Sequence, residues 1–207
     1  MALSKPLLIF ADLETESLKA SLLLQIAAVT ENNEKFSVYI NPQQALSKQC
    51  LQITGLYYHN GQLYRNGRLL CSITITHALR LFKKWLNSFE RPVHLVFHNA
   101  FSFDMKILLK HFVKQNISFP PCVVGVHDTL PSFRKHIKIT EISGFKLGLL
   151  AEYIKVPLID AHNAEDDALC LKNICETFTK EKGLSLNEFL DTYTKHPSDF
   201  LKKLTNP

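Results

Sequence analysis

The chain has 207 residues, of which 46% are hydrophobic and 21% are charged, and this composition excludes an intrinsically disordered or low-complexity protein. A chain of this length suits one domain, or one domain with a large insertion, and folding should bury about 70% of the surface of the unfolded form. Lys and Arg outnumber Asp and Glu by 24 to 19, giving a formal net charge of +5, which alone indicates only a slightly basic protein.

The cysteines and the amino terminus bear on the compartment. The five cysteines form no CxxC pair and mostly lie in apolar stretches, so we expect buried thiols in a reducing compartment, and neither a disulfide framework nor a zinc site. The apolar run near the amino terminus is short and ends in two acids, which is typical of neither a signal peptide nor a membrane span. We therefore expect an intracellular protein, of cytoplasm or nucleus, with no membrane partner.

The first part of the chain favours strands. Apolar runs predict strands at 7–11, 22–29 and 35–40. The first of them delivers Asp12 and Glu14 at its end, and the ENNE segment forms a hairpin turn between the other two. The pattern then weakens, and two Asn-Gly pairs indicate a small hairpin or a long loop over 57–70.

Helices and strands alternate in the rest of the chain. Apolar spacing predicts helices at 76–89, 104–115, 146–154 and 164–181, and strands at 93–99 and 123–129. A last helix begins at Ser185, which forms a capping box with Glu188. This order favours an α/β fold with a central mixed sheet covered on both faces. No linker divides the chain, so residues 1–207 are expected to form a single domain.

Four carboxylates follow or interrupt apolar segments. Asp12 and Glu14 are two residues apart on an extended segment, so their side chains leave the same face and repel each other unless a cation lies between them. Asp167 shares the inward face of its helix with Leu171, where a charge needs a partner. Asp104 follows a strand and, taken alone, is explained by helix capping. A pair of divalent cations would stabilise all four, and phosphodiester hydrolysis is a common use of such a pair.

His162 lies on a loop five residues before Asp167. It cannot share the helical face of Asp167, but it can reach the same cleft. A single histidine is more often structural, yet beside three acidic segments it is a candidate general base. A neutral imidazole takes a proton from water near pH 7 better than an ordinary carboxylate does.

Taken together, these segments resemble the DEDDh group of 3′–5′ exonucleases, and the resemblance covers most of residues 7–180. The resembling segments occur in the family's order and are DLETESL (12–18), ITGL (53–56), HNAFSFD (98–104), HDTL (127–130) and HNAEDD (162–167). The spacing within HNAFSFD and the Ala-Glu pair within HNAEDD are most similar to those of the three-prime repair exonucleases. They are also similar to the exonuclease-like domain of some promyelocytic leukaemia protein isoforms. The resemblance implies a ribonuclease H-like, three-layer α/β/α fold with a mixed five-stranded sheet.

The resemblance also implies roles for individual residues. Two Mg²⁺ ions, replaceable by Mn²⁺, would be bound by Asp12, Glu14, Asp104 and Asp167, with Asp12 bridging, and His162 would deprotonate the attacking water. The substrate would be DNA or RNA with a free 3′ end, preferably single-stranded, and the product a nucleoside 5′-monophosphate. The substrate-binding residues would be Leu18 against the terminal base, Ile53, Thr54, Gly55 and Leu56 around the 3′-terminal nucleotide, and Asn99, which would orient Asp104 or approach the substrate. For the ITGL segment alone, a strand end that turns at glycine is an equal interpretation.

Two segments depart from the family's pattern. Glu16-Ser17 stands where the family has Thr-Gly or Ser-Gly, which adds a negative charge near the substrate path. Residues 57–75 fit the pattern poorly, and we interpret them as an insertion that selects substrates.

Basic residues suggest where a strand would lie. Arg134, Lys135, Lys138 and Lys146 flank a predicted loop at 131–146, with Phe133 and Phe145 nearby. Such a loop could bind phosphates and stack bases. The stripe of Lys106, Lys110 and Lys114 has a simpler explanation as a solvated helix surface.

Two other functions fit the same residues. One is a nucleic-acid-binding or scaffolding module of this fold that has weak or lost turnover; Glu16 favours it, whereas the complete set of five chemical positions opposes it. The other is a ribonuclease H-type endonuclease, which would cleave circular substrates. The sequence favours neither DNA nor RNA as the substrate, and it does not identify any protein partner.

Overall fold

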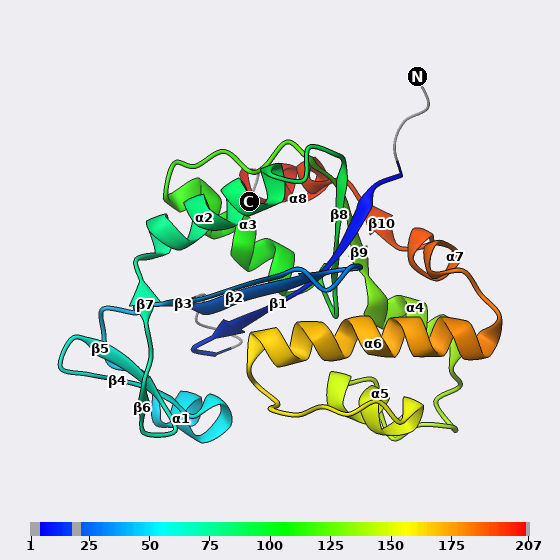
Figure 1. The fold of residues 1–207 in the computed structure, drawn as a ribbon, viewed down its shortest axis with the longest axis horizontal. Coiled ribbons are helices and arrows are strands. Elements are labelled where there is room, and N and C mark those ends of the chain that lie inside the picture. The colour runs from blue at the N-terminus through cyan, green and yellow to red at the C-terminus, as the bar shows by residue number, and fades with distance from the viewer. Residues whose placement is uncertain (1–4, 18–21, 206–207) are drawn as a thin grey trace.

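The computed structural model of the protein describes residues 5–17 and 22–205, and within these ranges the chain forms two sheets and eight helices (Figure 1). The large sheet has seven strands, in the order β10-β9-β8-β1-β2-β3-β7. Its strands are β1 (Leu7–Thr15), β2 (Leu23–Thr30), β3 (Lys35–Ile40), β7 (Ser72–Ile73), β8 (Val93–Phe97), β9 (Val123–Asp128) and β10 (Thr194–Lys195). β1, β2 and β3 pair antiparallel, whereas β1, β8 and β9 pair parallel.

The mixed sheet of the sequence prediction is confirmed, but the expected number of five strands is wrong. The two additional strands, β7 and β10, are edge strands of two residues each. Segments of this length are too short to show an alternating pattern of apolar and polar residues.

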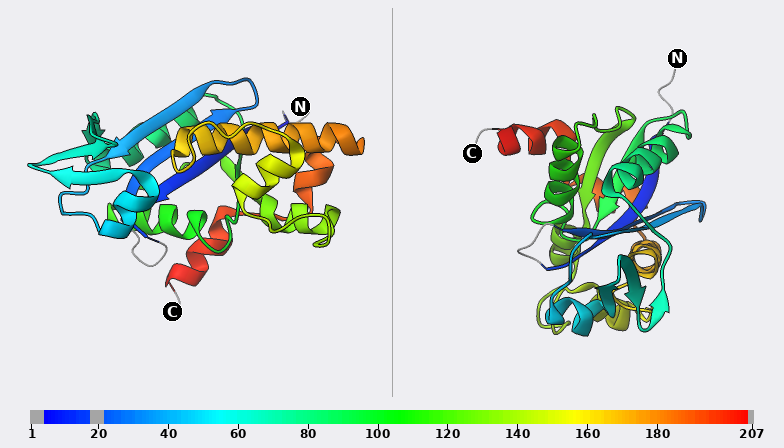
Figure 2. Two further views of the ribbon diagram at one scale, coloured as in Figure 1. Left: turned by 90° about the horizontal axis from the view of Figure 1, so that it is seen from below. Right: turned by 90° about the vertical axis from the view of Figure 1, so that its left-hand side faces the viewer.

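Helices cover both faces of the large sheet, as the predicted three-layer arrangement requires (Figures 1 and 2). One face packs against α2 (Ile75–Asn87), α3 (Asp104–Lys114) and α8 (Pro197–Thr205). The other packs against α4 (Thr129–His136), α5 (Leu147–Ile154), α6 (Ala164–Lys182) and α7 (Leu186–Asp191). The helices α2, α3, α5, α6 and α7 begin within one residue of the predicted positions. The helices α4 and α8 were not predicted, and α4 occupies part of the expected loop at 131–146.

The central strand β1 connects the two hydrophobic cores because its side chains alternate between them. The core beneath α2 and α3 contains Leu7, Ile9, Ala11 and Leu13, and the core beneath α6 contains Leu8 and Phe10. By the same alternation, Asp12 and Glu14 continue the row of Leu8 and Phe10 and face α6. Pairing with β2 continues as far as Thr15. The two acids therefore lie within the strand. The sequence analysis had placed them after its end, because it predicted a strand over 7–11 only.

A smaller unit projects from one side of the large sheet (Figure 1). It consists of α1 (Lys48–Thr54) and a three-stranded antiparallel sheet of β4 (Leu56–His59), β5 (Gln62–Arg65) and β6 (Arg68–Leu69). The predicted hairpin over 57–70 is thus present, with a third strand added. A small core of Leu24, Cys50, Leu56 and Leu63 joins this unit to β2.

Gly55 ends α1, so the interpretation of ITGL as a strand end was wrong. Its φ of 71° is left-handed, and its N–H donates a hydrogen bond to the carbonyl of Leu51. A Cβ at this position would lie 2.1 Å from Oδ1 of Asn66. Glycine is therefore required by the turn and by the close approach of the small sheet.

Two further expectations can be compared with the structure. Among the described residues, no helix combines the length and the apolar character needed to cross a bilayer. All five cysteines are free thiols, and Cys50, Cys170 and Cys175 are buried as expected. Cys71, however, is exposed and Cys122 is only partly buried.

Candidate metal centre

Three of the four predicted metal ligands converge between β1 and α6. One carboxylate oxygen of each of Asp12, Glu14 and Asp167 lies within 4.8 Å of the other two. Glu14 and Asp167 are each only 8% exposed, and Asp12 is half-buried. Asp167 reaches the group because α6 packs across β1 and β2 with its first turns at the site. We refer to these three residues as the carboxylate cluster.

Burial raises the pKa of every acid in the carboxylate cluster, and repulsion from other cluster members adds to this effect at Asp12 and Glu14. Burial, followed by the charge of Asp167, raises the pKa of Glu14 to about 8, although the Arg65 guanidinium acts in the opposite direction. Burial is also the main reason that the pKa of Asp167 rises to about 6. The pKa of Asp12 lies well above its ordinary value because of burial and the charges of its acidic neighbours. The cluster is therefore unfavourable in its fully ionised form unless a cation is bound.

Asp104 lies beside the carboxylate cluster. It is the first residue of α3, is buried, and does not belong to the group of oxygens within 4.8 Å. Burial, assisted by the charge of Asp128, raises its pKa to about 7. Among the neighbouring acids, Asp104 has the largest electrostatic effect on the pKa of Asp12. The structure thus brings three predicted ligands together and places the fourth within electrostatic reach.

These carboxylates fit a hard divalent cation. Across residues 5–17 and 22–202, the ion pairs involve other acids, namely Glu31, Asp160, Glu165 and Glu176. Among these residues, the four site carboxylates thus form no ion pair. A donor set made only of carboxylate oxygens is the kind that Mg²⁺ and Mn²⁺ prefer.

The backbone of His162 contacts the carboxylate cluster. Its N–H donates a hydrogen bond of 3.0 Å to Oδ2 of Asp167. Its φ is 63°, a left-handed conformation that is uncommon outside glycine. The residue is exposed to solvent. His162 is therefore attached to a candidate metal ligand through its backbone while its side chain remains accessible.

Gln25 positions the start of α6 relative to β1, a role that the sequence analysis missed. It lies on β2 directly opposite Glu14 and is buried. Its Nε2 donates to Oδ1 of Asn163 over 3.0 Å, and its Oε1 accepts from the N–H of Ala164 over 3.1 Å. The sequence did contain a signal for this role, since Gln25 is the one polar residue in the apolar run LLLQIAAV. A polar side chain that is buried in such a run needs hydrogen-bond partners.

Asp128 organises the turn that precedes Asp104. Its carboxylate accepts hydrogen bonds from the backbone N–H groups of Asn99, Phe101 and Leu130, at 2.9, 3.0 and 3.0 Å. Asn99 has a left-handed φ of 69° and takes part through its backbone. A role for its side chain toward Asp104 or the substrate stays a prediction.

The predicted substrate-binding residues differ in exposure. Ile53, at the end of α1, is 49% exposed, whereas Thr54 and Leu56 are buried. The hydroxyl of Thr54 donates to the carbonyl of Cys50 and accepts from the N–H of Leu56. Thr54 and Leu56 therefore have structural roles here, and Ile53 offers the accessible side chain. Leu18 lies outside the described residues.

Glu16 has a defined structural role. Its carboxylate accepts a hydrogen bond of 3.1 Å from the N–H of Ser47, the residue that caps α1. The acid that departs from the family's pattern thus attaches the start of α1 to the end of β1.

Known proteins resemble this chain in sequence over much of its length. The Exonuclease family model matches residues 9–175. The chain is 27% identical over 175 residues to DNA polymerase III PolC-type of Caldanaerobacter subterraneus, covering 82% of this chain and 11% of that protein. It is 38% identical over 93 residues to 3′-5′ exonuclease DinG of Staphylococcus epidermidis, covering 44% of this chain and 10% of that protein. The chain thus spans about a tenth of the length of these relatives.

Solved structures show the same fold. Exonuclease I of Escherichia coli in complex with a dA16 oligonucleotide superposes with a TM-score of 0.67 at 15% identity, covering 86% of this chain and 42% of that one. The zinc-bound complex of the same enzyme with single-stranded DNA gives a TM-score of 0.68 at 16% identity. The match to the family model over most of the chain shows that the protein belongs to the Exonuclease family and confirms its resemblance to DEDDh 3′–5′ exonucleases of ribonuclease H-like fold.

Proposed function

We propose that the protein is a metal-dependent 3′–5′ exonuclease that releases nucleoside 5′-monophosphates from the free 3′ end of single-stranded nucleic acid. The observation that carries the proposal is the carboxylate cluster in a chain of the Exonuclease family. The names of similar proteins support it, since DinG is described as a 3′-5′ exonuclease and the solved Exonuclease I structures contain single-stranded DNA.

Asp12 would be the ligand that the two ions share. Asp12 is the residue whose pKa is raised by the charges of Asp104, Glu14 and Asp167 together, which supports it as the bridging ligand. Two Mg²⁺ ions, or Mn²⁺ in their place, would stabilise charge on the attacking and leaving oxygens of the phosphodiester. The ligands must be deprotonated to bind them, so binding is coupled to proton release.

His162 is the better of two candidate bases. His98 is partly buried, and both of its ring nitrogens are engaged, Nδ1 with the Thr129 hydroxyl and Nε2 with the Phe145 carbonyl. His162 is exposed and lies next to the carboxylate cluster. It can accept a proton from the attacking water and pass it to solvent.

The 3′-terminal nucleotide would lie against the end of α1. Ile53 presents an exposed apolar side chain there, and Gly55, although occupied on its Cα side by Asn66, ends the helix beside it. We retain Leu18 and Asn99 as proposed contacts of the terminal nucleotide.

A basic pocket offers a path for the rest of the strand. It has a volume of about 630 Å³ and is lined by Arg134, Lys135, His136, Ile137, Lys138, Ile139 and Phe145. The Arg134 guanidinium lies 5.8 Å from the centre of the Phe145 ring. Phe133 is buried in the core and cannot stack on bases, contrary to the sequence prediction. The carbonyl of Phe145, which lines this pocket, lies 2.7 Å from Nε2 of His98, and His98 precedes the turn leading to Asp104.

The first prediction concerns activity. With Mg²⁺, the protein should shorten a 5′-labelled single-stranded oligonucleotide stepwise and leave a circular strand intact. Asp12→Asn and Asp167→Asn should reduce this activity to background because each removes a metal ligand. Asp166→Asn is the matched control: it alters the neighbouring acid, which lies outside the carboxylate cluster, and should retain activity.

Gel analysis of timed digests, with and without EDTA, distinguishes the alternatives. Cleavage of the circle would indicate an endonuclease. Binding of the oligonucleotide without any shortening would indicate a binding module.

The second prediction concerns His162. His162→Asn should lower kcat by about 10²- to 10⁴-fold, the contribution typical of a general base. Asn suits the left-handed backbone at this position, so the loop should keep its conformation. The stabilisation of the variant by Mn²⁺ in thermal unfolding should match that of wild type. An unchanged kcat, or a loss of Mn²⁺ binding, would contradict the assigned role.

The third prediction concerns pH and stability without metal. Glu14 has a folded-state pKa of about 8, above the unfolded value near 4.3. The folded state therefore holds an extra proton between these values, and its stability falls as pH rises through this window. In EDTA, Glu14→Gln should melt above wild type at pH 8.5 by at least about 4 °C, since each kcal/mol shifts the melting temperature by about 2–4 °C.

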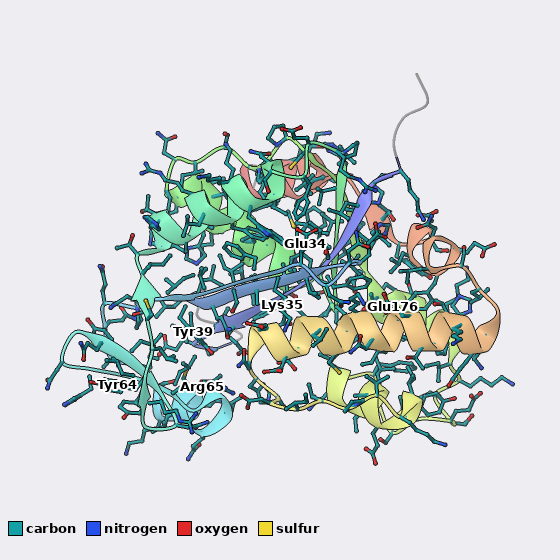
Figure 3. The ribbon with its side chains drawn as sticks, in the orientation of Figure 1. Glu34, Lys35, Tyr39, Tyr64, Arg65 and Glu176 are labelled. Carbon is teal, nitrogen blue, oxygen red and sulfur yellow. The ribbon has the colours of Figure 1, made fainter. Side chains whose placement is uncertain are left out.

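The difference between Glu14→Gln and wild type should nearly vanish at pH 4.5, where Glu14 is protonated in the folded state. The control is Glu34→Gln, which alters an exposed glutamate between β2 and β3 (Figure 3), outside the carboxylate cluster, and should show no such pH dependence. Scanning calorimetry of both variants at the two pH values provides the measurement. A Glu14→Gln protein no more stable than wild type at pH 8.5 would contradict the repulsion that we assign to the site.

The fourth prediction concerns the basic pocket. Combining Arg134→Ala with Lys138→Ala should raise KM and make the salt dependence of binding shallower by about 1.4 on a log–log scale, if each residue neutralises one phosphate of a single strand. The control combines Lys106→Ala with Lys114→Ala, which alter exposed residues of α3. Fluorescence anisotropy over a range of KCl concentrations provides the slopes. Equal slopes in wild type and the pocket variant would exclude this path.

A further inference from the structure

Arg65, the last residue of β5, connects three segments that lie far apart in the chain. Its Nε donates to the carbonyl of Thr54 at the end of α1 over 2.9 Å. Its Nη1 pairs with the carboxylate of Asp160, and its Nη2 donates to the other oxygen of the same carboxylate over 2.9 Å. The Nη2 group also donates to the carbonyl of His162 over 3.4 Å. Figure 3 shows Arg65 on the small sheet, beside α1.

The loop that contains Asp160 and His162 is consequently held through both backbone polar groups of His162, the candidate base. The N–H of His162 is bound by Asp167, a residue of the carboxylate cluster, and the carbonyl of His162 is bound by Arg65. Two residues earlier, the ion pair with Arg65 fixes the loop a second time. The left-handed backbone at His162 is thus held by contacts from two different parts of the fold.

The pair between Arg65 and Asp160 differs from an ordinary surface ion pair. The Arg65 side chain is only 11% exposed, and the guanidinium engages both carboxylate oxygens. Such forked pairs have a defined geometry, and removing one partner leaves a poorly solvated charge. The pair of Lys35 and Glu165 is a suitable contrast, because it also attaches the start of α6 to the sheet but is 45% and 38% exposed.

We propose that Arg65 is a positioning residue that holds the His162 loop against the carboxylate cluster. The small sheet and α1 then act as the support of this loop, in addition to any selection of substrates by residues 57–75. The inference rests on the proposed function, because it assigns His162 the proton transfer. Arg65 itself touches neither the cluster nor the substrate in this role, and it acts through the backbone of His162.

The kinetic test compares Arg65→Gln, Arg65→Lys and Asp160→Asn on a 5′-labelled oligonucleotide with saturating Mg²⁺. Each variant should lower kcat by about 10- to 100-fold, the scale expected for a misplaced catalytic group, and should leave KM within about twofold. Arg65→Lys keeps the positive charge near Glu14 but loses the fork, so it separates positioning from charge. Combining Arg65→Gln with Asp160→Asn should cost no more than the larger single effect, since both remove one interaction.

The matched controls are Lys35→Gln and Glu165→Gln, which should retain the wild-type kcat. A kcat of the Arg65 and Asp160 variants equal to wild type would overturn the proposal, and so would a loss that appears only in KM. If Arg65→Gln does not fold, Asp160→Asn decides the question, because its side chain is 45% exposed and tolerates the change more readily.

Hydrogen exchange tests the same contact without catalysis. In the metal-free protein, amides within residues 157–166 should exchange faster in Arg65→Gln than in wild type, and at the wild-type rate in Lys35→Gln. Unchanged exchange would show that Arg65 does not hold the loop and would overturn the proposal. A wild-type protein that degrades no nucleic acid, but whose loop loosens in Arg65→Gln, would overturn the proposed function and leave Arg65 as a structural anchor only.

Discussion

The mutual repulsion of buried carboxylates is the constraint on which the site depends. Asp12 and Glu14 follow two apolar residues on one face of β1, and α6 adds Asp167 to the same place. None of these acids would be stable as an ion in this environment without a nearby positive charge. The two cores on either side of β1 hold these segments together, and their burial of apolar surface acts against the electrostatic cost.

Polar side chains away from the cluster give it a fixed geometry. Gln25 sets the start of α6 against β2, Asp128 shapes the turn before Asp104, and Arg65 attaches the loop of His162 to the small sheet. Each of these residues bonds to backbone groups and not to the candidate metal ligands themselves. Hydrogen bonds to the backbone restrict the movement of whole loops. The segments that carry the acidic side chains therefore have little freedom to move apart.

Much of the site could be predicted because its signals are local. The two-residue period of β1 places Asp12 and Glu14 on one face, and the helical period places Asp167 inward with Leu171. The sequence order of the acidic segments then indicates the family. The elements that were missed, α1, α4, α8 and the edge strands, are short or form by capping and tertiary contacts, and a periodicity of a few residues carries little information.

Contacts between distant segments were beyond sequence reasoning. Nothing in the pattern around Arg65 indicates that it pairs with Asp160, 95 residues away. The exposure of Cys71 and the burial of Phe133 likewise depend on how elements pack, because both residues lie in segments without a clear apolar period. The expected basic loop at 131–146 is wrong in its first part for the same reason, since Asp128 caps a helix, α4, that continues to His136.

The left-handed backbone at position 162 limits which residues can replace the histidine over evolutionary time. A β-branched side chain in this conformation costs roughly 1–2 kcal/mol, whereas Asn, Asp and Gly adopt it readily. A descendant of this domain that no longer needed the imidazole would therefore drift toward Asn, Asp or Gly before Val or Ile. Because Arg65 and Asp167 bind only the main chain there, such a descendant could keep the whole architecture, and its loss of chemistry would be visible in one position alone.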